Sequence, residues 1–118
     1  MKFDIKIPLY NQTITVSDNM PDEYKHNYAA GFEYETQTLY YQSGHFTPDR
    51  IAHECVHIAN WVCERVGIAL EYRNDECLAY LVQYLFANIS KKVNTQEKKN
   101  ATKRNNTVNN RMACGNIS

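Results

Sequence analysis

Long hydrophobic runs, a signal-like start and cysteine pairs of the C-x-x-C type are all missing from this 118-residue chain. A membrane-spanning helix needs roughly 18 or more predominantly apolar residues in a row, and no stretch approaches that length. A secretory signal combines a basic start with an apolar segment, and the chain does not begin in that way. We therefore expect a cytoplasmic protein that does not enter a membrane.

Cysteines are few, and their positions argue against a disulfide framework. The chain has Cys55, Cys63, Cys77 and Cys114, of which the first three fall in predicted helices. Cytosolic thiols normally stay reduced, so buried free thiols explain these residues better than disulfides do. Cys77 could be considered as a metal ligand, although a small apolar residue of a helix is the simpler interpretation.

Charge is balanced over the whole chain but not along it. Residues 91–118 carry seven basic side chains and one acid, a net charge of +6, whereas residues 1–90 carry twelve acids and six basic side chains, a net charge of −6. The basic segment is rich in Lys, Asn and Thr and has few apolar side chains, so we expect a mobile tail after a single domain at 1–90. A basic tail can touch nucleic acid, but a solvated tail is the simpler explanation because no aromatic residue lies among its charges.

Alternating apolar and polar residues predict a small sheet in the first third of the chain. Residues 2–9 and 13–16 read as strands of one hairpin, and the aromatic and threonine-rich stretch that follows predicts a second hairpin of 32–35 and 38–42. A short helix within 22–30 is weakly indicated. The fold class that we predict is α+β.

The most informative stretch is H-E-x-x-H at residues 53–57. On an α-helix His53 and His57 lie one turn apart on the same face, so their imidazoles can bind one metal ion. Glu54, beside the first histidine, is free to act as a general base toward metal-bound water. The pattern therefore predicts a zinc site with a catalytic carboxylate next to it.

Flanking signals predict that this motif is helical. Thr47 is a typical N-cap, Pro48 suits the first helical position, and Gly67 is typical of a helix end. Apolar residues recur at helical spacing between these signals, at Ile51, Cys55, Ile58, Ala59, Val62 and Val66. The two histidines fall on a different face of the helix from this stripe, together with Asn60 and Glu64.

A catalytic zinc ion usually takes three protein ligands, so a third donor is needed. Glu76 follows His57 after eighteen residues, near the start of a second predicted helix that Asn74 or Asp75 would cap. Glu71 and Asp75 are neighbouring carboxylates, and His45 is a further candidate. In the second helix Leu78, Leu81, Val82, Leu85 and Ile89 form the apolar stripe.

H-E-x-x-H followed by Asp75-Glu76 and then Ala79-Tyr80 resembles the gluzincin metallopeptidases, in particular the small ImmA/IrrE-like and phage-encoded members. The resemblance covers about residues 47–87. It implies a zincin-like fold, with a small antiparallel or mixed sheet packed on the metal helix and a second helix. It also implies Zn²⁺ bound by His53, His57 and Glu76, with Glu54 as general base. Tyr80 stands where the thermolysin-like pattern has an aspartate that orients the first histidine.

The resemblance implies hydrolysis of peptide bonds in a specific protein substrate, in the cytoplasm of the bacterial host for a phage-encoded protein. An extended substrate would pair with the free edge of the strand that precedes the metal helix. Tyr72 and Tyr80 are candidate stabilisers of the oxyanion, although structural tyrosines are the more common case. The alternative is an accessory or inhibitory module that keeps the zinc site and binds a partner without turnover.

Overall fold

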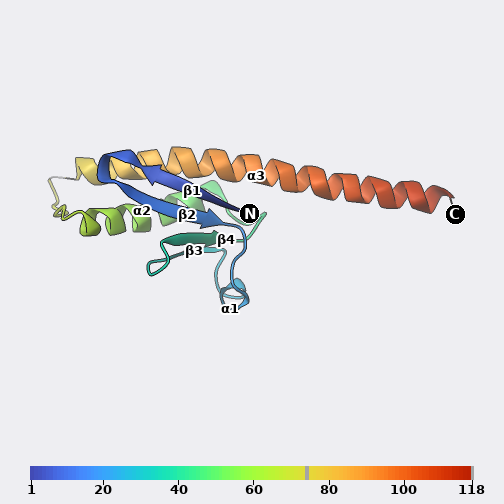
Figure 1. Cartoon of the computed structure of the whole chain (residues 1–118), viewed down its shortest axis with the longest axis horizontal. Coiled ribbons are helices and arrows are strands. Elements are labelled where there is room, and N and C mark those ends of the chain that lie inside the picture. The colour runs from blue at the N-terminus through green and yellow to red at the C-terminus, as the bar shows by residue number, and fades with distance from the viewer. Residues whose placement is uncertain (74, 118) are drawn as a thin grey trace.

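The computed structural model describes residues 1–73 and 75–117, with side chains as far as residue 103. Eight elements follow one another along the chain: β1 (Lys2–Ile7), the 3-10 turn η1 (Pro8–Tyr10), β2 (Gln12–Ser17), α1 (Asp22–Lys25), β3 (Ala30–Glu33), β4 (Thr38–Tyr41), α2 (Pro48–Arg65) and α3 (Glu76–Ile117). The α+β class is confirmed, with one small mixed sheet and two long helices (Figure 1).

The four strands lie in the order β1-β2-β4-β3. The pairs β1–β2 and β3–β4 are antiparallel, as the two predicted hairpins require, whereas β2 and β4 run parallel. The reversal between β1 and β2 passes through Asn11, whose φ of 51° is in the left-handed region. Because the second hairpin adds through β4, β3 is left at the edge of the sheet. The strand directly before α2, β4, has a neighbour on each side and so lacks the free edge that the sequence led us to expect.

Both long helices cover the same face of the sheet, α2 on the β3 side and α3 on the β1 side. On one side the Trp61 ring of α2 lies 5.4 Å from the Phe32 ring of β3. On the other, the Tyr84 hydroxyl of α3 donates a hydrogen bond of 2.7 Å to the Lys6 carbonyl of β1. The core between these layers includes Ile5, Ile14, Val16, Leu39, Ile51, Cys55, Ile58, Val62, Leu81, Leu85 and Ile89.

Helix α2 begins and ends where the sequence predicts. Thr47 is the extended N-cap residue, Pro48 occupies the first helical position, and Gly67 has a φ of +77° just after the end. A left-handed residue at this point lets the Ile68 N–H bond back to the Cys63 carbonyl, at 2.8 Å. The predicted stripe is the buried face of α2.

The helix predicted within 22–30 is shorter than expected, since α1 covers only Asp22–Lys25. Of the thiols, Cys55, Cys63 and Cys77 are free, and the side chain of Cys114 lies outside those described. Asn74, one of the two expected caps of the second helix, is likewise outside the described residues. In the part of the chain that the structure describes, none of the helices combines the length and hydropathy needed to cross a bilayer.

The body of the protein extends past the boundary predicted at residue 90. Helix α3 continues without a break, and beyond Ser90 the side chains of Val93 and Gln96 are buried, at 1% and 8% exposure. Further along, α3 projects beyond the sheet and α2 (Figure 1), which gives the molecule extents of 68 × 27 × 23 Å. The described part of the basic segment is therefore a helix, and its first three turns belong to the packed domain.

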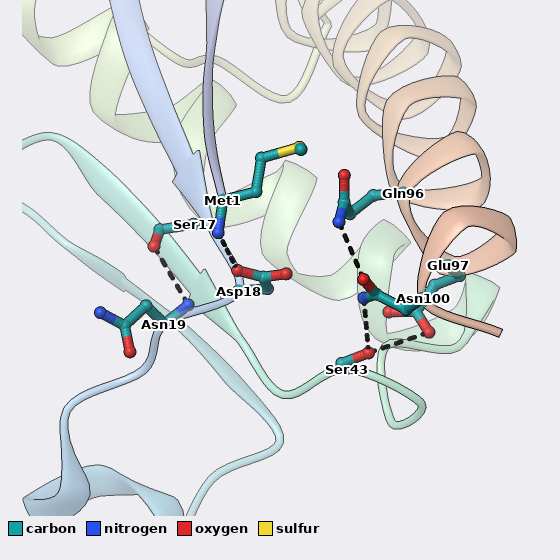
Figure 2. Close-up of polar contacts among 8 residues, drawn as sticks. All are labelled: Met1, Ser17, Asp18, Asn19, Ser43, Gln96, Glu97 and Asn100. Atoms are coloured by element: carbon teal, nitrogen blue, oxygen red, sulfur yellow. Dashed lines mark hydrogen bonds and ion pairs between the residues drawn. The ribbon is translucent and has the colours of Figure 1, made fainter. Parts of the chain in front are cut away.

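Polar contacts fix α3 to the loop that leads into α2 (Figure 2). A carboxylate oxygen of Glu97 accepts hydrogen bonds from the Ser43 hydroxyl and the Gly44 N–H, each at 3.1 Å. Asn100 donates to the Ser43 hydroxyl at 3.1 Å and accepts from Gln96 at 3.0 Å. The one acid of the basic segment thus anchors the approach to the helix that carries the histidines.

Candidate functional site

The two histidines of the motif converge on one point. Their Nε2 atoms are 3.2 Å apart, with ring centroids at 4.9 Å and the planes at 71°. Zinc–nitrogen bonds of about 2.0–2.1 Å in tetrahedral geometry place two ligand nitrogens about 3.3 Å apart. The spacing between His53 and His57 therefore fits a pair of zinc ligands closely.

Helix α2 brings this pair together because residues four apart lie one turn apart on the same side of a helix. Both histidines lie on the face opposite the buried stripe, where Asn60 and Glu64 are also exposed. Both rings are exposed, so both are accessible to a shared ligand.

Glu54 is nearly buried, whereas the two histidines are exposed. Its side chain is 8% exposed, and it has no hydrogen-bond partner among the described residues. Burial raises the pKa of its carboxyl group, and the nearby charges of His57 and His53 act in the opposite direction. A carboxylate that is shielded from water, unpaired and next to two imidazoles has the properties required of a general base.

Glu54 and His53 line an open cavity of about 400 Å³ between the first half of α2 and the segment before β3. The other lining residues are Asn27, Tyr28, Ala29, Ala30, Asp49 and Arg50. Because Ala30 begins β3, this cavity lies where the edge strand meets α2. Its position is that expected of a cleft in which an extended chain reaches Glu54.

The third predicted ligand is not near the imidazoles. Glu76 is exposed at the first residue of α3, which begins beside the C-terminal end of α2 (Figure 1). His57 precedes Arg65, the last residue of α2, by eight residues, or about 12 Å along the helix axis. Among the described residues, no three His, Cys, Asp or Glu side chains lie close enough together to bind a metal ion. The structure thus brings together two members of the predicted set.

The remaining candidates are also separate from the histidine pair. Tyr72 and Tyr80 are 94% and 67% exposed, and neither lines the cavity. Glu71, Asp75 and Cys77 are exposed in or next to the start of α3. His45 is exposed in the loop before α2, where its carbonyl accepts a hydrogen bond of 2.6 Å from Arg50.

Asp49 is a carboxylate that the sequence analysis did not select. It lies one turn before His53 on the same face of α2 and lines the same cavity. A hydrogen bond from Thr47 is the main reason that the pKa of Asp49 is lowered, so the carboxylate stays charged. The spacing Asp49, His53, His57 is visible in the sequence as three residues four apart.

Comparisons with protein-family models, with curated proteins and with solved structures find no match for this chain.

Proposed function

We propose that this protein is a zinc-dependent peptidase with a zincin-like arrangement of sheet and helices, which hydrolyses peptide bonds in a specific protein substrate. The observation that carries the proposal is the pair of imidazole nitrogens 3.2 Å apart, beside a nearly buried carboxylate that lines a cavity. A structural metal site has no need of such a base, which favours a hydrolytic role.

The residues take separate roles in this proposal. His53 and His57 would hold the ion, which when bound would polarise the substrate carbonyl and make water acidic enough to ionise near neutral pH. Glu54 accepts the proton of the attacking water and passes it to the leaving amine nitrogen. Burial raises the proton affinity of Glu54, which suits a group that must both take up a proton and release it.

Glu76 remains the third ligand in this proposal, although among the described residues it does not lie together with the two imidazoles. Asp49 offers a carboxylate on the same helix as the histidines, one turn away. Either residue would complete three protein ligands and leave a fourth position for water or substrate.

The edge strand β3 supports peptide as the class of substrate. Its place at the end of the sheet leaves backbone N–H and C=O groups without a neighbouring strand, and a peptide can bind by adding a strand there. A peptide paired with Ala30 at the start of β3 would pass the cavity that Glu54 and His53 line. The positions of β3 and α2 support hydrolysis of a peptide held along this edge.

The test is cleavage of a diverse peptide library by zinc-loaded protein, with products read by mass spectrometry. We expect Glu54→Gln to retain zinc and to lose turnover by at least about 10³-fold, since the substitution removes the proton acceptor at almost constant volume. Glu64→Gln, an exposed carboxylate on the same helix, is the matched control and should cleave as the wild type does. A Glu54→Gln protein as active as the wild type would refute the mechanism.

A binding module without turnover is the second candidate. It is favoured because, among the described residues, no third ligand-type side chain lies with the histidine pair, and two protein ligands are fewer than a catalytic zinc usually takes. The two candidates differ in product formation: a zinc-loaded wild-type protein that binds peptides but yields no fragments would support the module.

A further inference from the structure

A second and larger cavity lies against the edge strand. It measures about 740 Å³ and is lined by Met20, Glu23, Tyr24, Tyr28, Gly31, Phe32, Glu33, Tyr34, Glu35 and Tyr40. Three of these residues are glutamates and four are tyrosines, and none carries a positive charge. The cavity therefore combines negative charge with aromatic faces, which is the chemistry that recognises organic cations.

The carboxylates of this cavity are not neutralised within the molecule. None of the three glutamates has an ion-pair partner in the part of the chain with described side chains, and Lys25, next to Tyr24, pairs instead with Asp22 at 3.0 Å. Glu33 accepts a single hydrogen bond, from the Thr36 hydroxyl at 2.9 Å. Negative charge is therefore available to a ligand.

Two of these glutamates, Glu23 and Glu33, act on the same side chain. The charge of Glu23, followed by burial and the charge of Glu33, raises the pKa of the Tyr24 hydroxyl, and Tyr40 contributes to the same shift. Groups from α1 and from both strands of the second hairpin thus converge on one region. A cation placed there would meet two carboxylates and the faces of the tyrosines together.

The cavity adjoins the candidate catalytic cleft. Tyr28 lines both cavities, and the lining runs along β3 from Gly31, next to Ala30 of the smaller cavity, to Glu35 in the following turn. An extended peptide advances about 3.3 Å per residue. A side chain entering the larger cavity would therefore lie within roughly one to four residues of a bond held next to Glu54.

We propose that this glutamate- and tyrosine-lined cavity is a specificity pocket for an arginine or lysine side chain of the peptide that lies along β3. The inference rests on the proposed function for the place of the peptide, and it names the substrate class: peptides with a basic residue near the cleaved bond. Arginine suits the pocket best because its planar guanidinium stacks on aromatic rings and bonds to carboxylates with two N–H groups.

Gly31 provides a way to close the pocket without disturbing the fold. A Cβ atom built at Gly31 has nothing within 4 Å, and Gly31 is not among the residues with positive φ. It lies opposite Tyr40 in the antiparallel pairing of β3 and β4. Gly31→Val should therefore keep the strand, for which β-branched residues are suited, while its side chain occupies space beside Tyr40.

The experiment measures binding in the Glu54→Gln protein, in which cleavage cannot consume the peptide. An acetylated seven-residue peptide of Ala and Ser with one central Arg is titrated against ¹⁵N-labelled protein, beside the same peptide with neutral citrulline. We expect amide shifts across Gly31–Glu35 and at least about tenfold tighter binding of the Arg peptide. Glu33→Gln with Glu35→Gln should remove that preference, and Gly31→Val should weaken the binding of both peptides.

Asp22→Asn is the matched control, because Asp22 is an exposed acid next to Glu23 that does not line the cavity. It should change the affinity less than twofold, and every variant should melt within a few degrees of the parent protein. Equal binding of the Arg and citrulline peptides, or full binding by the double variant, would overturn the inference. A wild-type protein that binds the Arg peptide in this way but never cleaves it would refute the proposed peptidase and leave the pocket standing.

Discussion

At the scale of single residues, the sequence predicts the histidine pair well because its geometry is local. Residues four apart on a helix lie on the same face, so His53 and His57 point in similar directions. In the structure their Nε2 atoms are 3.2 Å apart. The burial of Glu54 was not foreseeable in the same manner. It depends on how closely the segment before β3 approaches α2, and no local pattern encodes that approach.

Zinc should stabilise the protein through the histidine pair. We expect zinc in molar excess to raise the melting temperature of the wild type, because an ion that binds only the folded protein stabilises it. Free zinc at 100 times its dissociation constant would add about 2.7 kcal/mol to the free energy of unfolding. His57→Ala should abolish the rise, and differential scanning fluorimetry measures it.

Asn60→Ala serves as the control for this change, since Asn60 is exposed on the same face of α2 and is not a zinc-ligand candidate. Its melting temperature should rise with zinc as that of the wild type does. An undiminished rise in His57→Ala would remove His57 from the ligand set.

Tyr41 is a residue whose hydroxyl costs stability. The side chain is fully buried, and its oxygen has no hydrogen-bond partner among the described residues. Tyr41→Phe removes a buried unsatisfied hydroxyl and keeps the stacking on Phe46, whose ring centroid is 5.0 Å away. The free energy of unfolding at pH 7 should therefore stay unchanged or rise by about 1–2 kcal/mol. Urea unfolding followed by circular dichroism gives the value.

The same variant should be less sensitive to alkali. Burial, followed by the charges of Asp18 and Glu97, raises the pKa of Tyr41 in the folded state. Above pH ~10 the unfolded chain releases this proton and the folded protein does not, so the wild type loses up to about 1.4 kcal/mol per pH unit. Between pH 7 and 10.5 the wild type should lose more stability than Tyr41→Phe; an equal loss would contradict this assignment.

At the scale of elements, periodicity predicted α2 and the presence of both hairpins, although β3 covers 30–33 rather than 32–35. It could not place the start of α3 relative to the histidines. The separation of eighteen residues between His57 and Glu76 includes a loop, and the loop determines which turn of α3 lies beside the site. Glu76 is the first residue of α3, and α3 begins beside the end of α2 rather than beside its middle (Figure 1).

The composition of residues 91–103 predicts a solvated tail, but these residues form a helix whose first turns pack on the domain. Val93 and Gln96 continue the buried stripe of Leu85 and Ile89 at spacings of four and three residues, but lysines and asparagines around them indicate a solvated segment. The tertiary contacts of Glu97 with the Ser43 loop cannot be foreseen, because they join residues 54 positions apart.

A chain that ends after Ser90 should therefore be less stable than one that ends after Lys103. The shorter chain loses the burial of Val93 and the hydrogen bonds of Gln96, Glu97 and Asn100, together about 2–4 kcal/mol. Denaturant midpoints of the two truncated chains and the full chain measure the difference. Equal stability of all three would show that the domain ends at residue 90.

At the scale of the whole molecule, the sheet, α2 and the first part of α3 act together to place one strand edge beside one helix face. The acidic body supplies both cavities along β3, while the basic charge is gathered on α3 from Lys91 onward. This separation of charge leaves the glutamates near the edge strand without an ion-pair partner among the described side chains. It follows from the order of the elements and could not be read from net charge, which is zero.

The central claim is that this arrangement binds one zinc ion between the two imidazoles. Crystals grown with zinc and measured on both sides of its absorption edge test it directly. The account predicts an anomalous peak about 2.0–2.1 Å from Nε2 of His53 and of His57, with a carboxylate of Glu76 or Asp49 as a further ligand. A fully zinc-soaked crystal without a peak at these nitrogens would contradict it.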